Sequence, residues 1–239
     1  MSRPSGASPA AGTGTGTGAG TDLRTVVLVR HGVTELTEAR AYSGGGVPGP
    51  SLTTRGRTQA ARAADAVFRV GKDLWPDLPR AGALVASPLV RTLETAAAVG
   101  RRIGQHVRPD GRFAECDFGA WEGLTPDAIA DGWPHEFAAW STTGTDRAPG
   151  GESYADVGER AWAGLRDVVA ATDPGATSVV VSHTVTIRAL AGRALGAPVS
   201  SWRLLRVPPC SLTVLRFGLG DDGEPALAEV TATGFPTDV

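Results

Sequence analysis

Residues 25–32 read TVVLVRHG, and this stretch decides the fold. Its first five residues are β-branched or leucine and do not alternate with polar residues, which is typical of a strand covered on both faces. Such a strand predicts a parallel sheet flanked by helices. In open sheets of this kind, ligands bind beyond the carboxyl ends of the strands. We therefore expect anion binding and covalent or proton chemistry at Arg30 and His31, where this strand ends.

Two further apolar runs end in the same way. Residues 83–86 (ALVA) lead into a helical pattern that carries Arg91 in its first turn, and residues 178–181 (SVVV) lead to His183 at the start of another. We expect these side chains to join the first strand end at one edge of the sheet. Guanidinium forks and helix N-termini match the oxygens of a phosphate group. The sequence therefore predicts a phosphate pocket at this edge.

The order of predicted elements indicates a three-layer α/β/α fold with a mostly parallel, doubly wound sheet. We predict strands at 25–30, 83–87 and 177–182, helices at 53–70, 88–104, 153–171 and 184–195, an extended piece near 106–113 and small helices between 124 and 140. Closing strands are predicted at 204–207 and 211–217, and a further edge strand can follow at 225–232.

Composition indicates one domain behind a polar tail. Residues 1–22 are rich in Gly, Thr, Ala and Pro and are predicted to be a disordered tail, which leaves residues 23–239 as the folded domain. No apolar run is long enough for a secretory signal or a membrane span. A net charge of −2 gives no reason to expect a nucleic-acid partner. Two cysteines, Cys116 and Cys210, are too few for a disulfide scaffold and fit a cytoplasmic location.

Several motifs occur in a fixed order along the chain: LVRHGVT (28–34), SPLVRT (87–92), ECDFGAWEG (115–123), PGGES (149–153) and VSH (181–183). Together they resemble the histidine phosphatase superfamily, also called phosphoglycerate mutase-like, over about residues 24–217. The sequence at residues 41–44 (AYSG) and 117–123 is most similar to that of the phosphatase branch that includes α-ribazole phosphatases and actinobacterial acid phosphatases.

The resemblance implies a role for each motif residue. His31 would attack the phosphoryl group and become a phosphohistidine, and Glu115 would donate a proton to the leaving oxygen. Arg30, Arg91 and His183 would hold the phosphoryl oxygens as charge redistributes. Further phosphate or substrate contacts are implied for Thr37, Ser43, Gly44 and Thr184. Thr37 stands where the family often has Asn and Thr184 where it usually has Gly, so these two positions are expected to affect substrate preference.

Other phosphatase chemistries fit the sequence less well. Cys210 and Arg216 have the Cys-x5-Arg spacing of tyrosine phosphatases, but the segment between them lacks the glycines of such a loop and alternates like a strand. A buried strand thiol is the better interpretation. His106 and His135 lie in segments without metal-ligand spacing and are expected at the surface, and no metal or other cofactor is predicted.

Two rivals use the same fold. A mutase must retain a bisphosphorylated intermediate and needs extra cations, yet Arg147 is the one Lys or Arg between Gly123 and Gly150. A non-catalytic phosphoester-binding protein would not need both a nucleophile and an acid. We therefore predict a cytoplasmic phosphomonoester hydrolase acting on a small phosphorylated metabolite, with an aromatic lid from Trp121, Trp133, Phe137 and Trp140. The sequence does not determine the oligomeric state, and a homodimer is one option.

Overall fold

The computed structural model describes residues 22–237. The predicted tail, residues 1–22, lies outside the described part of the chain except for Asp22. None of the helices within residues 22–237 is long and apolar enough to cross a membrane.

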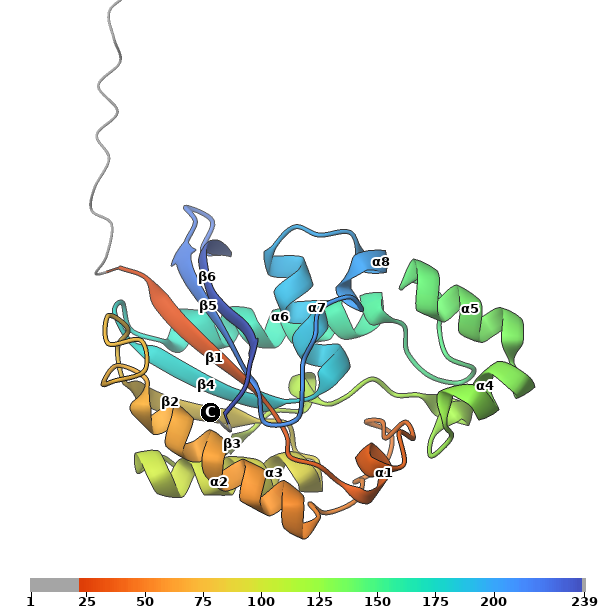
Figure 1. The fold of residues 1–239 in the computed structure, drawn as a ribbon. Helices are drawn as coiled ribbons and strands as arrows, with labels where there is room; N and C mark the ends of the chain where they lie inside the picture. Colours follow the sequence, from red (N-terminus) through yellow and green to blue (C-terminus); the bar gives the residue numbers. More distant parts are fainter. Residues whose placement is uncertain (1–21, 238–239) are drawn as a thin grey trace, which may run out of the picture.

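The described chain forms a six-stranded sheet with helices on both faces (Figure 1). The strands are β1 (Arg24–Arg30), β2 (Ala81–Ala86), β3 (Arg108–Pro109), β4 (Thr177–Ser182), β5 (Leu212–Leu219) and β6 (Pro225–Phe235). They are arranged in the order β3-β2-β4-β1-β5-β6. The four strands from β3 to β1 are parallel, whereas β5 is antiparallel to β1 and β6 to β5. The predicted α/β/α fold with a mostly parallel sheet is confirmed.

Two helix pairs form the outer layers of the fold. Figure 1 shows α2 (Thr54–Arg69) and α3 (Val90–Ile103) on one face of the sheet, and α6 (Tyr154–Ala171) and α7 (Thr184–Ala194) on the other. Successive side chains of a strand point to opposite faces. Accordingly, Val27 and Val29 of β1 belong to the core under α2 and α3, whereas Val26 and Leu28 belong to the core under α6 and α7. This division explains why the strand shows no polar alternation.

A third, mainly aromatic core lies beyond the carboxyl ends of the parallel strands. There, α1 (Glu35–Glu38), α4 (Pro126–Gly132) and α5 (Pro134–Thr143) extend away from the sheet (Figure 1). The single-turn 3-10 helices Gly111–Phe113 and Gly119–Trp121 belong to the loop between β3 and α4. Trp121, Trp140 and Tyr154 are buried in this core together with Phe118. Phe118, Trp140 and Tyr154 of this core also line the candidate site.

The structure corrects three details of the predicted element order. Residues 204–207 are not a strand: they follow the short helix α8 (Val199–Trp202) as irregular chain, in which Leu204 is 70% exposed. The prolines at 208 and 209 carry no N–H groups for a strand ladder. Neither α8 nor α1 was predicted. Cys210 is buried as expected, but it lies in the turn before β5 with φ +58° and not within a strand.

Candidate active site

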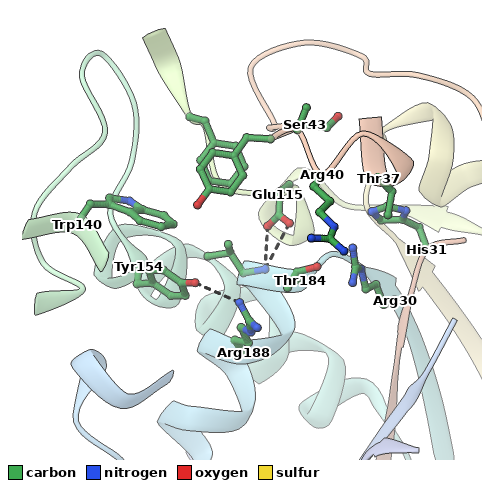
Figure 2. Close-up of a pocket in the computed structure, with 14 residues that line it drawn as sticks. Arg30, His31, Thr37, Arg40, Ser43, Glu115, Trp140, Tyr154, Thr184 and Arg188 are labelled. Atoms are coloured by element: carbon green, nitrogen blue, oxygen red, sulfur yellow. Dashed lines mark hydrogen bonds between the residues drawn. The ribbon is translucent and has the colours of Figure 1, made fainter. Parts of the chain in front are cut away.

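A pocket of about 240 Å³ lies at the carboxyl ends of the parallel strands (Figure 2). Its lining comes from the end of β1, from α1 and the loop after it, from the 114–118 loop, and from α5, α6 and α7. The lining residues are Arg30, His31, Thr37, Arg40, Ala41, Tyr42, Ser43, Glu115, Phe118, Trp140, Tyr154, Thr184, Val185 and Arg188.

His31 lies at the inner end of this pocket and is 5% exposed. Its Nδ1 lies 2.7 Å from the carbonyl oxygen of Gly32, which can only accept a hydrogen bond. The ring proton is therefore assigned to Nδ1, and Nε2 carries the lone pair. Burial and the positive charges of Arg91 and Arg30 keep the pKa of His31 well below its usual value. The ring is thus neutral near pH 7.

The loop that carries His31 is fixed by close backbone contact with α2. A Cβ atom on Gly32 would lie 2.5 Å from the carbonyl oxygen of Gly56, and one on Gly56 would lie 2.1 Å from that of Val33. Both positions therefore need glycine. Because the loop and the first turn of α2 meet backbone to backbone, the position of His31 is set by the fold.

His183 follows β4 and faces His31, with their ring centroids 5.1 Å apart. It is fully buried, and its Nε2 lies 2.8 Å from Ser87 Oγ. Ser87 Oγ accepts the Leu89 amide hydrogen at 3.4 Å and can donate its own hydrogen to Nε2, which leaves the ring proton on Nδ1. Burial, followed by the charge of Arg91, places the pKa of His183 well below its usual value. This ring is also neutral.

Two arginines bring positive charge to the same end of the pocket. Arg30 donates from Nη1 to the Val207 carbonyl at 2.8 Å, and burial lowers its pKa to about 10, so it remains a cation at neutral pH. Arg91 is fully buried in the first turn of α3 and donates from Nη2 to the carbonyl oxygens of Ser43 and Gly44 at 2.9 and 3.2 Å. Arg91 does not line the open pocket and lies behind this loop.

Several buried polar atoms of the site have no hydrogen-bond partner. Within residues 22–237, nine buried side-chain nitrogen or oxygen atoms lack a partner, and five belong to this site: Arg30 Nε, Ser43 Oγ, Arg91 Nε, Arg91 Nη1 and His183 Nδ1. Leaving a buried donor unsatisfied costs about 1–3 kcal/mol. Five such atoms in one place are suited to an anion with several acceptor oxygens, as a phosphate group is.

Glu115 enters the pocket from the loop that follows β3, and it is 6% exposed. Its Oε1 accepts hydrogen bonds from the Cys116 amide at 3.0 Å and from the Val185 amide at 3.1 Å, and Oε2 lies 3.3 Å from the latter (Figure 2). The first turn of α7 thus orients the carboxyl group. Of the predicted catalytic set, Arg30, His31 and Glu115 line the pocket directly, while Arg91 and His183 are packed behind it.

The predicted binding residues divide into two groups. Thr37, Ser43 and Thr184 line the pocket. Gly44 does not: its amide donates to Glu122 Oε2 at 2.7 Å, and its carbonyl accepts from Arg91. Gly44 therefore positions Arg91. The Thr37 hydroxyl lies 3.0 Å from Thr34 Oγ, so it already has a partner within its own turn.

Of the four aromatic residues predicted to form a lid, only one lines the pocket. Trp140 lines the pocket, but Trp121 is fully buried in the third core, and neither Trp133 nor Phe137 lines the pocket. Tyr42, Phe118 and Tyr154 complete the aromatic wall instead, with the rings of Tyr42 and Phe118 stacked at 4.5 Å.

Sequence reasoning missed two arginines of the pocket, Arg40 and Arg188. Arg188 is a charged residue between apolar residues in the first half of α7, and this signal could have identified it. Arg40 follows α1 and has a φ of +55°, in the left-handed region. No local sequence pattern predicts this conformation for an arginine. Arg147, by contrast, pairs with Asp156 at 2.6 Å and does not line the pocket.

The alternative chemistries find no support in the described residues. Burial raises the pKa of Cys210 to about 12, which disfavours the thiolate, and Arg216 pairs with Glu229 at 2.8 Å. His106 and His135 are exposed, as predicted. Within residues 22–237, no group of three or more His, Cys, Asp or Glu side chains is arranged to hold a metal ion.

The family model of the histidine phosphatase superfamily (branch 1) matches residues 26–231. The chain therefore belongs to this superfamily, and the predicted resemblance is confirmed. It is 37% identical over 210 residues to a bifunctional protein of Mycobacterium tuberculosis, a match that covers 88% of this chain and 54% of that protein. The chain thus spans about half the length of this relative. It is 33% identical over 189 residues to the glucosyl-3-phosphoglycerate phosphatase of Mycolicibacterium vanbaalenii, covering 77% of this chain and 79% of that one.

Solved structures agree with this assignment. The structure of a mycobacterial glucosyl-3-phosphoglycerate phosphatase is similar with a TM-score of 0.73 and 31% identity, and the match covers 87% of this chain and 97% of the other. A proposed α-ribazole-5′-phosphate phosphatase of Escherichia coli matches with a TM-score of 0.70 at 20% identity, covering 89% of this chain and 98% of the other, and shares the fold.

Proposed function

We propose that this protein hydrolyses a phosphate monoester of a small metabolite through a phosphohistidine on His31. The observation that carries this proposal is the set of five buried, unpartnered polar atoms beside the neutral imidazole. The site presents a nucleophile with its lone pair available and donors for the group it attacks. Similarity to phosphatases supports the same reaction class.

In the first step, His31 Nε2 forms a bond to phosphorus while the bond from phosphorus to the ester oxygen breaks. Arg30, Arg91 and the Nδ1–H group of His183 bind the three non-bridging oxygens, whose charge is redistributed in the transition state. Glu115, entering this step protonated, gives its proton to the departing oxygen, so the product leaves as an alcohol.

In the second step, water replaces the alcohol in the pocket. Glu115, now a carboxylate, takes a proton from this water, and the resulting hydroxide attacks phosphorus as the bond to His31 breaks. Inorganic phosphate leaves and the neutral imidazole is restored. Splitting one difficult displacement into two in this way is the usual benefit of covalent catalysis.

Hydrolysis is favoured over a mutase reaction by the position of Arg147. This residue is directed to Asp156 and adds no charge to the pocket, so the 123–150 segment supplies no clamp for a bisphosphorylated intermediate. The lining is also rich in guanidinium groups, which repel a metal cation. We infer a reaction that needs neither a metal nor another cofactor.

The decisive experiment concerns His31. His31→Ala should abolish hydrolysis, and rapid quenching with ³²P-labelled substrate should trap an acid-labile phosphoenzyme in the parent protein alone. The exposed His106→Ala serves as a matched control and should keep both activity and the phosphoenzyme. With 3-phosphoglycerate in EDTA, phosphate release should exceed isomerisation. Substantial turnover by a folded His31→Ala variant would disprove the proposal, and efficient isomerisation primed by bisphosphoglycerate would establish a mutase instead.

A further inference from the structure

A glycine-rich loop, residues 43–49, holds the guanidinium group of Arg91 in place. Arg91 Nη2 donates to the Ser43 and Gly44 carbonyl oxygens at 2.9 and 3.2 Å. A Cβ atom on Gly49 would overlap Arg91 Nη1, so the loop backbone also meets the guanidinium group there. Nε and Nη1 of Arg91 are buried and have no partner within residues 22–237. The position of the loop therefore decides where these two donors point.

Glu122 fixes the loop from its other side. This residue is half-buried, and its Oε2 accepts the Gly44 amide hydrogen at 2.7 Å, a short distance that is typical of a charge-assisted hydrogen bond. Gly45 donates its amide hydrogen to the Cys116 carbonyl at 3.0 Å. A Cβ atom on Gly44 would lie 2.7 Å from both the Cys116 carbonyl oxygen and Glu122 Oε2. The loop thus rests on the 116–122 segment with no room for a side chain between them.

One peptide group connects Glu122 to Arg91. The Gly44 amide and the Ser43 carbonyl belong to the same planar unit, whose atoms move together. The carboxylate binds the N–H end of this unit and the guanidinium group binds its C=O end. An anion at the donor end and a cation at the acceptor end polarise the peptide group in the same direction, so each hydrogen bond strengthens the other. Glu122 and Arg91 are therefore coupled without a direct ion pair.

The charges of the two side chains agree with this coupling. Burial lowers the pKa of Arg91, and the negative charges of Glu115 and Glu122 oppose that shift. Burial raises the pKa of Glu122, whereas the Gly44 hydrogen bond and the charge of Arg91 oppose that shift. Each group thus favours the charged form of the other.

We propose that Glu122 is a positioning residue, which holds Arg91 through the Ser43–Gly44 peptide group so that Nε and Nη1 of Arg91 meet the phosphoryl oxygens. This inference rests on the proposed phosphatase function. Glu122 does not line the pocket and transfers no proton. Because Arg91 binds the phosphoryl group that every ester shares, Glu122 affects all esters alike.

The test begins with the loss of the carboxylate. Glu122→Leu should lower kcat/KM about tenfold both on an alkyl phosphate and on p-nitrophenyl phosphate, because the hydrogen bond to Gly44 is lost. Binding of inorganic phosphate, measured by titration calorimetry, should weaken by a similar factor. Glu122→Gln keeps an acceptor in the same place and should lose only about threefold. A proton donor would instead affect the alkyl ester much more than the aryl ester.

A double-mutant cycle shows whether the effect passes through Arg91. In the Arg91→Ala protein, Glu122→Leu should change phosphate affinity and kcat/KM by less than about twofold, because the group that Glu122 positions is gone. Glu136→Gln is the control: it alters an exposed carboxylate of α5 that does not line the pocket, and it should have no effect. If thermal unfolding shows that Glu122→Leu does not fold, the same cycle is run with Glu122→Gln.

The results separate this inference from the proposed function. A tenfold loss for Glu122→Leu whether or not Arg91 is present would overturn the positioning role, and so would a loss confined to the alkyl ester. Either result leaves the phosphatase function standing. If the parent hydrolyses no phosphate ester, the proposed function fails, and the cycle on phosphate affinity alone then decides whether Glu122 positions Arg91.

Discussion

The carboxyl group of Glu115 illustrates how single residues of this site are set by their hydrogen bonds. Both of its oxygens face the Val185 amide at the start of α7, and Oε1 also accepts from Cys116. A backbone amide at a helix N-terminus cannot be moved by a side-chain rotation, so the direction of the carboxyl group is fixed. A proton donor needs such a fixed direction toward the leaving oxygen.

Replacing the carboxyl group of Glu115, the proposed proton donor, should reduce the rate most for esters with poor leaving groups. Glu115→Gln should reduce kcat/KM on an alkyl phosphate about 100-fold or more, but by less than about tenfold on p-nitrophenyl phosphate, whose phenolate leaves without a proton. Arg91→Ala, the comparison variant, should reduce both by about 100- to 1000-fold because it serves the phosphoryl group common to every ester. Steady-state kinetics of both variants on the two esters measure these losses in kcat/KM. Equal losses for Glu115→Gln would mean that Glu115 orients the site, and Asp117 or Glu122 would become the next candidate for the acid.

At the scale of elements, helix α6 holds the loop that carries Glu115. Arg160 of α6 donates to the carbonyl oxygens of Arg112, Ala114 and Glu115 at 2.8–2.9 Å, and its guanidinium group also pairs with both carboxylate oxygens of Glu152 at 2.8 Å. Burial alone would raise the pKa of Glu152, but the hydrogen bonds and charge of Arg160 outweigh it and lower that pKa. One arginine therefore ties the 112–115 loop to the helix.

Loss of this arginine should loosen the loop. Arg160→Met keeps the helix but removes these hydrogen bonds, and the free energy of unfolding in urea should fall by on the order of 2 kcal/mol. Activity on an alkyl phosphate should fall as well, because Glu115 is no longer held. Arg166→Met is the matched control: its partner Glu224 is on the surface, and that pair should contribute less than about 1 kcal/mol. A loss for Arg160→Met no larger than for Arg166→Met would show that the loop is held by other contacts.

At the scale of the whole molecule, two buried neutral histidines make folding dependent on pH. The pKa values of His31 and His183 lie well below the usual value in the folded chain. Their unfolded pKa is about 6.5. As the pH falls below that value, the unfolded chain binds protons that the folded chain does not, so stability that is complete above about pH 6.5 is lost in acid.

Between pH 7 and 5.5 the two histidines together should lower the free energy of unfolding by about 2 kcal/mol. Urea titrations at both pH values, in buffer without phosphate, measure this change. His183→Gln removes one buried imidazole and should roughly halve the histidine contribution. His106→Gln alters an exposed imidazole and should leave the pH dependence as it is. If both variants flatten the curve equally, burial of His183 is not the cause.

The sequence by itself determined the parallel strands of the sheet and which residues follow them at the His31 end of the pocket. An apolar run without alternation identifies a strand buried on both faces, and β1 is such a strand because Val26 and Leu28 enter one core while Val27 and Val29 enter the other. Parallel strands end at one edge, so the residues that follow them must converge. The order of the strands and motifs along the chain was therefore enough to predict that His31 and His183 lie close together.

Only the tertiary structure decided which side chains beyond the strand ends line the pocket. Arg40, Tyr154 and Arg188 come from three separate segments, and nothing in their local sequence indicates that all three line one pocket. The 204–207 segment shows the same limit. Its apolar residues next to Pro208 and Pro209 predicted a closing strand, but the carbonyl oxygens of Leu205 and Val207 accept hydrogen bonds from Arg188 and Arg30 instead of from a neighbouring strand. Periodicity reports which face of an element is buried, whereas contacts between loops depend on the relative placement of elements that only packing of the whole chain sets.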